Sequence, residues 1–440
     1  MYRTWIIGIC SLKFLTKASH LLAFVTEQKK RVVNISFYLF ASMIQLFVGL
    51  ATSPLISKTL SHRDFAIVGY FNSFLTLLTP LIGLMLGSYY ARTYFRVQNK
   101  EREVLRNTIV SLLLSYGAVS TLVSCLLFLV FLRLSEPGFP FFPYTVLSFG
   151  TVVFGQIYNF YLLNLRLTKR AKQYFLVSLY HHLFYGFMMI LLCVVYRYGA
   201  AGSLGATLIT SILFSVVFLK SLLTKFQIER KTLKPIFQFC WPLIVAGVLQ
   251  YFFSGVDRAL LATLRDDTNL GLYSVAFRIT SYIGVFYAAI SMTIEPDIYQ
   301  SLAQRKYRKL ALLMGLLIGV KLAIVLVFNW LAPFVVNILT AGRYNDAVQY
   351  ARILSFKNVS SSIYSSMSLI IIGLGYSKVT LVNRVIGTIG VFAMYKVLIS
   401  NYGFIGAAWG QVASFLILSL FSFMFLAYKA LGKKDRARVS

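Results

Sequence analysis

Acidic residues are scarce in this sequence of 440 residues. Asp and Glu number 13 against 43 Lys and Arg, and charged residues make up 13% of the chain, about half of the share typical of soluble domains. The four cysteines stand singly in apolar stretches, without the spacing of metal ligands or of a disulfide framework. Neither the G-x-x-x-x-G-K-[ST] loop of nucleotide hydrolases nor the H-E-x-x-H motif of zinc proteases occurs. These absences argue against ATP hydrolysis, and we expect neither a metal nor another cofactor.

Long apolar runs, by contrast, fill most of the chain, and hydrophobic residues make up 58% of it. A hydrocarbon core of ~30 Å needs about twenty apolar residues in a helix, and a helical bundle satisfies the backbone of many such segments in lipid. The sequence therefore predicts an all-α polytopic membrane protein with about twelve transmembrane helices. The predicted spans are 34–57, 68–89, 108–132, 144–165, 175–196, 202–222, 239–261, 272–294, 310–338, 352–373, 379–399 and 404–428.

The segments outside these spans are alternately rich and poor in Lys and Arg. By position, about thirty of the 43 cations fall on one side of the membrane and about six on the other. Because cytoplasmic loops accumulate Lys and Arg, both termini are predicted to be cytoplasmic. The net charge of +30 is then a signal of membrane topology, and no nucleic-acid partner is expected.

A short internal repeat divides the predicted spans into two halves. Tyr198-Gly199, which opens the sixth span, is matched 204 positions later by Tyr402-Gly403 at the twelfth. Six spans in each half make this a parallel repeat, with two lobes related by an axis along the membrane normal. The predicted domains are a cytoplasmic or interfacial segment (1–33), a first lobe (34–224), a cytoplasmic linker (225–238), a second lobe (239–428) and a basic cytoplasmic tail (429–440).

Apart from Lys220 at the end of the sixth span, the cations inside the predicted spans all belong to the second half. Arg352 and Lys396 lie near span ends, where their side chains can reach the interface. Five cations lie deeper, where a Lys or Arg costs roughly 2.5–3.5 kcal/mol on insertion scales: Arg258, Arg278, Lys321, Lys357 and Arg384. Asp257 is the one acid within a span, so two interpretations stay open. The cations either form structural ion pairs or line a cavity that binds an anion, and one acid cannot neutralise them all.

Two other features of the spans concern flexibility and protons. Pro242 and Pro333 mark places where helices of the second half are expected to bend, because proline removes a backbone hydrogen bond. His181 and His182 are adjacent in the fifth span and are candidates for proton relay.

The order of several motifs resembles polysaccharide flippases of the Wzx type. These flippases belong to the multidrug/oligosaccharidyl-lipid/polysaccharide exporter superfamily, with multidrug extruders and the peptidoglycan-precursor flippase. The resemblance covers about residues 34–430. It rests on the segments 55–65 (LISKTLSHRDF), 239–244 (FCWPLI), 255–261 (GVDRALL), 269–278 (NLGLYSVAFR), 342–344 (GRY) and 403–408 (GFIGAA).

The resemblance implies a two-lobed MATE-like exporter in the bacterial inner membrane that opens alternately to either side. Its expected substrate is an oligosaccharide on undecaprenyl pyrophosphate, from an O-antigen, capsule or exopolysaccharide pathway. Membrane lipids, and a polysaccharide polymerase with its chain-length machinery, are the implied partners. The deep cations would then receive the pyrophosphate, with Asp257 serving ion coupling or structural pairing. The first lobe departs from related flippases that carry cations there too.

Two other functions compete with a flippase. A drug/cation antiporter of the same fold would favour an acidic cavity, whereas this one is basic. A membrane polymerase or ligase of lipid-linked glycans would need catalytic groups in an outer loop, and the predicted outer loops are short. We therefore expect a transporter and not an enzyme.

Overall fold

The computed structural model describes residues 36–438, except 39, 42, 95–96, 136–137, 305 and 374–375. The predicted N-terminal segment 1–33 lies outside the described residues. Every regular element within the described part of the chain is a helix, which confirms the all-α prediction.

The helices follow one another with short connections. Those of the first half are Ser36–Thr59, α2 (His62–Gly83), α3 (Leu86–Tyr94), α4 (Asn99–Ser135), α5 (Tyr144–Leu167), α6 (Ala171–Ile190) with a π-helical turn η1 (Leu191–Val195), and α7 (Gly199–Leu222). Those of the second half are α8 (Arg230–Ser254), α9 (Val256–Ala262), α10 (Asp267–Ala303), α11 (Tyr307–Thr340), α12 (Ala347–Gly373) and α13 (Ser377–Arg438). Because α13 turns at Gly403, it contains two of the predicted spans.

Each predicted span coincides with helix, and nine helical stretches of the described residues are long and apolar enough to cross a membrane. The turn-containing α13 counts once among the nine, and α10 and α12 are not among them. These two helices carry deep cations, Arg278 and Lys357, and α12 also carries a dense group of serines.

The second and seventh predicted spans differ from the observed helices in where a helix starts or breaks. The second span was expected over 68–89, but α2 starts at His62, capped by Ser61, and ends where Leu84 turns left-handed (φ 46°). Helices α8 and α11 run continuously through Pro242 and Pro333, and the bends expected at these prolines stay predictions. The seventh span breaks at Gly255 instead, where a Cβ would lie 2.8 Å from the Ser73 carbonyl oxygen. A close approach of α2, and not a missing hydrogen bond, sets this break.

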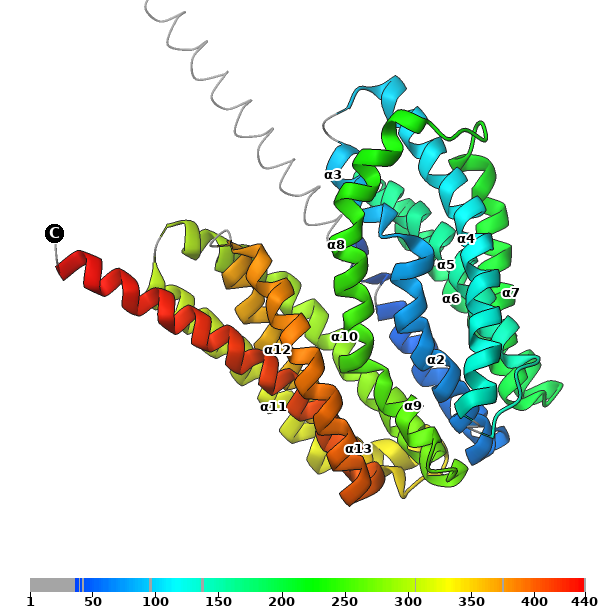
Figure 1. Cartoon of the computed structure of the whole chain (residues 1–440). Coiled ribbons are helices and arrows are strands. Elements are labelled where there is room, and N and C mark those ends of the chain that lie inside the picture. Colours follow the sequence, from blue (N-terminus) through cyan, green and yellow to red (C-terminus); the bar gives the residue numbers. More distant parts are fainter. Residues whose placement is uncertain are drawn as a thin grey trace, which may run out of the picture.

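The two halves form a V that is closed at one end and open at the other (Figure 1). They diverge toward the end that carries α3 and the C-terminus. At the closed end the loop after α11 joins the first half, because Tyr344 donates a hydrogen bond to the Leu60 carbonyl and Arg343 to that of Lys58. Ser53 donates to the Leu339 carbonyl at 3.0 Å in the same region.

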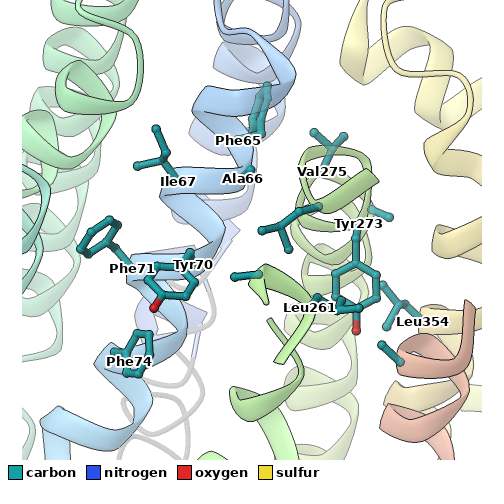
Figure 2. Packing of buried hydrophobic residues seen from close by; sticks show 14 of the residues in the cluster. Phe65, Ala66, Ile67, Tyr70, Phe71, Phe74, Leu261, Tyr273, Val275 and Leu354 are labelled. Atoms are coloured by element: carbon teal, nitrogen blue, oxygen red, sulfur yellow. The ribbon is translucent and has the colours of Figure 1, made fainter. Parts of the chain in front are cut away.

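Helices α2 and α10 pack against each other between the halves, and their side chains form the main core (Figure 2). Figure 2 shows Tyr70 and Phe74 of α2 beside Leu261 of α9 and Tyr273 of α10. Close contact of the backbones depends on Gly69, where a Cβ would lie 2.1 Å from Ser274 Oγ. Positions 69 and 274 are 205 residues apart (274 − 69), nearly the repeat offset. The two equivalent helices therefore meet at equivalent points.

The two glycines of the repeat seen in the sequence share a positive φ. Gly199 and Gly403 have φ of +56° and +53°, a region that side chains disfavour. Three residues later, a Cβ on Gly202 would lie 2.9 Å from the Leu192 carbonyl oxygen, and one on Gly406 would lie 2.0 Å from that of Leu398. Each Tyr-Gly pair thus starts a helix pressed against the end of the preceding one. The domain boundaries drawn from the sequence remain predictions.

Candidate functional site

A cavity of about 610 Å³ lies within the second half, among α8, α10, α11, α12 and α13. Among its described lining side chains, two are cations, none is an acid, and many are hydroxyl groups. We call it the basic cavity, and its lining residues are Gln250, Ser254, Ser291, Ile298, Leu317, Lys357, Ser361, Tyr364, Ser365, Ser366, Ser368, Leu369, Arg384 and Phe415.

The two cavity cations are held mainly by aromatic rings and neutral groups. Lys357 of α12 places its ammonium 4.1 Å from the centroid of the Phe277 ring on α10. Arg384 of α13 donates to the Tyr364 hydroxyl and to the Ala246 carbonyl, both at 3.2 Å. A ring face attracts a cation but does not neutralise it, so both charges stay available to an anion.

Asp257 and Arg258 form a buried pair on α9, outside the lining of the basic cavity. Arg258 Nε lies 3.7 Å from Asp257 Oδ1, and the Tyr273 hydroxyl donates to Asp257 Oδ2 at 2.6 Å. Arg258 also places its guanidinium 4.0 Å from the centroid of the Phe277 ring. The Phe277 ring thus contacts both the paired Arg258 and the cavity cation Lys357.

Lys321 of α11 is the most buried of the deep cations, with 2% of its surface exposed. Its ammonium donates to Ser291 Oγ at 2.7 Å and to Ser362 Oγ at 3.1 Å. Ser291 lines the basic cavity, so Lys321 stands directly behind the cavity wall. In a medium of low dielectric constant its charge still acts on the cavity through that hydroxyl.

Arg278 lies apart from this group. Its guanidinium is close to the phenol groups of Tyr282 on α10 and Tyr185 on α6. It therefore contacts the first half across α10, and it does not line the basic cavity.

The structure thus brings together four of the five predicted deep cations. Lys357 and Arg384 share a cavity, Lys321 stands behind its wall, and Arg258 meets Lys357 at one ring. Among the described residues, only Arg258 of the five has a carboxylate within 4.0 Å. Arg352 and Lys396 are exposed, as expected for cations near span ends.

Sequence reasoning from charge missed the hydroxyl groups of the cavity. Residues 360–368 of α12 contain six serines, of which four line the cavity: Ser361, Ser365, Ser366 and Ser368. Ser368 is 9% exposed, and its buried Oγ has no hydrogen-bond partner. So many hydroxyls in one predicted span were a visible signal, because an apolar span has no use for them.

The chain matches two sequence families and several solved structures. The polysaccharide biosynthesis protein family matches residues 32–302, and the MatE family matches residues 242–398. An inward-facing multidrug resistance MATE transporter of the MOP superfamily is similar at 17% identity and a TM-score of 0.72, over 89% of this chain and 99% of that one. The lipid II flippase MurJ in an inward closed conformation is similar at 15% identity and a TM-score of 0.70, over 89% and 87%.

A MATE structure in a bent conformation is also similar, at 18% identity and a TM-score of 0.59, over 93% of this chain and 97% of that one. At these identities the likeness to solved structures shows the fold alone, which is that of MATE-like transporters. No curated protein gives a significant match.

Proposed function

The chain belongs to the polysaccharide biosynthesis protein family, and from this premise we propose that it is a flippase for oligosaccharides linked to undecaprenyl pyrophosphate. One observation carries the proposal: Lys357 and Arg384 line one cavity, and neither has a carboxylate within 4.0 Å among the residues that the structure describes. A pyrophosphate is the anion that suits such a site, since it accepts several charge-assisted hydrogen bonds at once. Lys321 adds positive potential through the wall, and the serines supply neutral donors.

The shape of the molecule supports the direction of transport. The halves diverge at the end that carries the basic loops and the C-terminus, and they meet at the end that carries Tyr344 (Figure 1). With the predicted orientation, the open end faces the cytoplasm, where the lipid-linked oligosaccharide would enter. The headgroup would occupy the cavity while the prenyl chain stays in lipid. Rocking of the halves would then expose the sugars outside, where a polymerase and its chain-length machinery would use them.

A drug/cation antiporter is the second candidate, because the fold is shared with a multidrug resistance MATE transporter. The charge of the basic cavity opposes it. A cationic drug in this cavity would meet Lys357 and Arg384, and no carboxylate is among the described lining residues. Drug susceptibility of a deletion strain separates the two functions: we expect no change in susceptibility but an accumulation of lipid-linked oligosaccharide.

The site is tested by removing the two cavity charges. Each charge-assisted contact is worth about 1.5–3 kcal/mol, so Lys357→Gln and Arg384→Gln should each weaken pyrophosphate binding about 10–100-fold. We expect the double variant to lose surface polysaccharide and to leave the lipid-linked oligosaccharide on the cytoplasmic leaflet.

Arg352→Gln and Lys396→Gln are matched controls, because they remove exposed cations from α12 and from the same helix as Arg384. At equal protein levels they should export normally. Normal export by the double cavity variant would refute the assignment of the basic cavity.

A further inference from the structure

A second cavity, of about 750 Å³, lies between the first half and α10. Helix 36–59, α5, α6 and α7 form its walls, with Ser281 and residues 284–286 of α10 closing one side. Its described lining residues include Gln45, Tyr158, Asn159, Ser178, His181 and His182, and no Lys, Arg, Asp or Glu is among them. We call it the neutral cavity. Its size lies within the range of about 300–1,000 Å³ that is usual for ligand sites.

A stacked pair of rings marks the wall of the neutral cavity. Tyr158 of α5 and His181 of α6 lie parallel, with ring centroids 4.0 Å apart and planes inclined by 10°. Both carry a buried polar atom without a hydrogen-bond partner, Tyr158 Oη and His181 Nδ1. Tyr158 is only 6% exposed, so its unpaired hydroxyl is costly. Buried polar groups nearly always have a partner, and these two atoms therefore point to a ligand with hydrogen-bonding groups.

The chemistry of the lining decides the class of ligand. A pyrophosphate would need a cation, a cationic drug would need an acid, and a prenyl chain would leave the orphan polar atoms unpaired. A sugar ring suits all of these features, because it has apolar faces for aromatic contact and hydroxyls for neutral side chains. Asn159 and Gln45 are exposed and offer further amide groups.

We propose that the neutral cavity binds the uncharged sugar rings of the lipid-linked oligosaccharide while the basic cavity binds its pyrophosphate. This inference rests on the proposed function. Helix α10 connects the two sites, since Ser281 lines the neutral cavity and Ser291 the basic one. At a rise of ~1.5 Å per residue, these positions lie about 15 Å apart along the helix axis. One headgroup, with its sugars attached directly to the pyrophosphate, reaches both cavities.

The test compares two probes on the full-length protein in lipid nanodiscs. Farnesyl pyrophosphate has the anion and a prenyl chain but no sugar. The second probe is the lipid-linked oligosaccharide extracted from a strain that lacks this gene. We expect Tyr158→Ala and His181→Ala to weaken binding of the oligosaccharide about tenfold or more and to leave farnesyl pyrophosphate binding within about twofold. Retained binding of the sugar-free probe also demonstrates that each variant is folded.

Three further variants complete the design. Tyr158→Phe keeps the ring and removes the orphan hydroxyl. It should therefore weaken binding of the oligosaccharide by a smaller factor, about threefold to tenfold. Tyr180→Ala is the control, because Tyr180 lies beside His181 on α6 but is 62% exposed and does not line the cavity. Lys357→Gln should weaken binding of both probes, since both contain the pyrophosphate.

The outcomes separate this inference from the proposed function. Unchanged oligosaccharide binding in the Tyr158 and His181 variants, or equal loss of both probes in all of them, would overturn the inference alone. Failure of the wild-type protein to bind either probe would overturn the proposed function and the inference with it.

Discussion

The neutral cavity and the basic cavity both border α10, yet their linings have little in common. The first offers stacked rings, amides and histidines, and the second offers Lys357, Arg384 and serines. The backbones of the two halves are nevertheless equivalent at Gly199 and Gly403 and at the contact of Gly69 with Ser274. The comparison teaches that the repeat preserves the positions where helices turn and halves meet, whereas the side chains inside each half have diverged. A carrier needs the shared turning and contact positions for its motion, and it needs the diverged side chains to bind its ligand.

The largest effect that we expect outside the cavities concerns Arg258, which pairs with Asp257. Asp257→Asn would leave the buried Arg258 without its carboxylate, and breaking a buried pair in this way costs about 3–5 kcal/mol. Thermal unfolding of the purified protein should show a clear loss of stability. Lys357→Gln removes a cation that has no carboxylate partner, and it should change stability much less.

The double variant Asp257→Asn/Arg258→Gln distinguishes the two roles of Asp257. It should recover much of the lost stability, because neither buried charge is then unpaired. If Asp257→Asn instead keeps its stability and loses export, Asp257 acts in ion coupling and the structural interpretation is wrong.

A smaller effect on stability is expected from substitutions of the two repeat glycines, Gly199 and Gly403. Gly199→Ala and Gly403→Ala both place a side chain at positive φ, at a cost of about 1–3 kcal/mol. The alanine at 199 would also lie 2.5 Å from Asp64 Oδ1, which accepts a hydrogen bond from the Ala200 N–H. Nothing lies within 4 Å of the corresponding position at 403. Thermal unfolding should therefore show a larger loss for the first variant, and equal losses would contradict the predicted contact.

The smallest effect concerns the contact between the halves at the closed end. Tyr344→Phe removes a single hydrogen bond to the Leu60 carbonyl, worth about 1 kcal/mol, so opening at this end should become about fivefold more populated. Pulsed electron paramagnetic resonance between spin labels at Lys58 and Asp346 measures the change. Tyr402→Phe removes an exposed hydroxyl and serves as the control. A distance distribution identical to that of the wild-type protein would exclude this contact from the gate.

The sequence predicted where most helices lie, but our interpretation of it missed the start of α2 and the break at Gly255. The start of α2 was missed although Ser61 and Asp64 have the spacing of a capping box, which the structure contains. The break at Gly255 was not predicted, because the approach of Ser73 is not visible in a sequence. The predicted cytoplasmic location of both termini stays a prediction.

The candidate site was predictable residue by residue but not as an arrangement. Depth in a predicted span identified Lys357 and Arg384 because burial of a charge in lipid has to be compensated. The same reasoning gave no reason to separate Arg278, which turns toward Tyr185 of the first half. The neutral cavity carried no charge signal, and His181 and His182 stood out in the sequence only as candidates for proton relay.

By itself the sequence determined that this chain is a helical membrane protein with a repeated architecture and with deep cations in the spans of its second half. Apolar length, loop charge and glycine placement act through local physics, so they can be read in order along the chain. Only the tertiary structure decided which cations share a cavity, which one is paired and which hydroxyls accompany them. Those relations depend on helix rotation and on contacts between segments far apart in the chain, such as Lys321 with Ser291 and Ser362. No local pattern specifies such contacts.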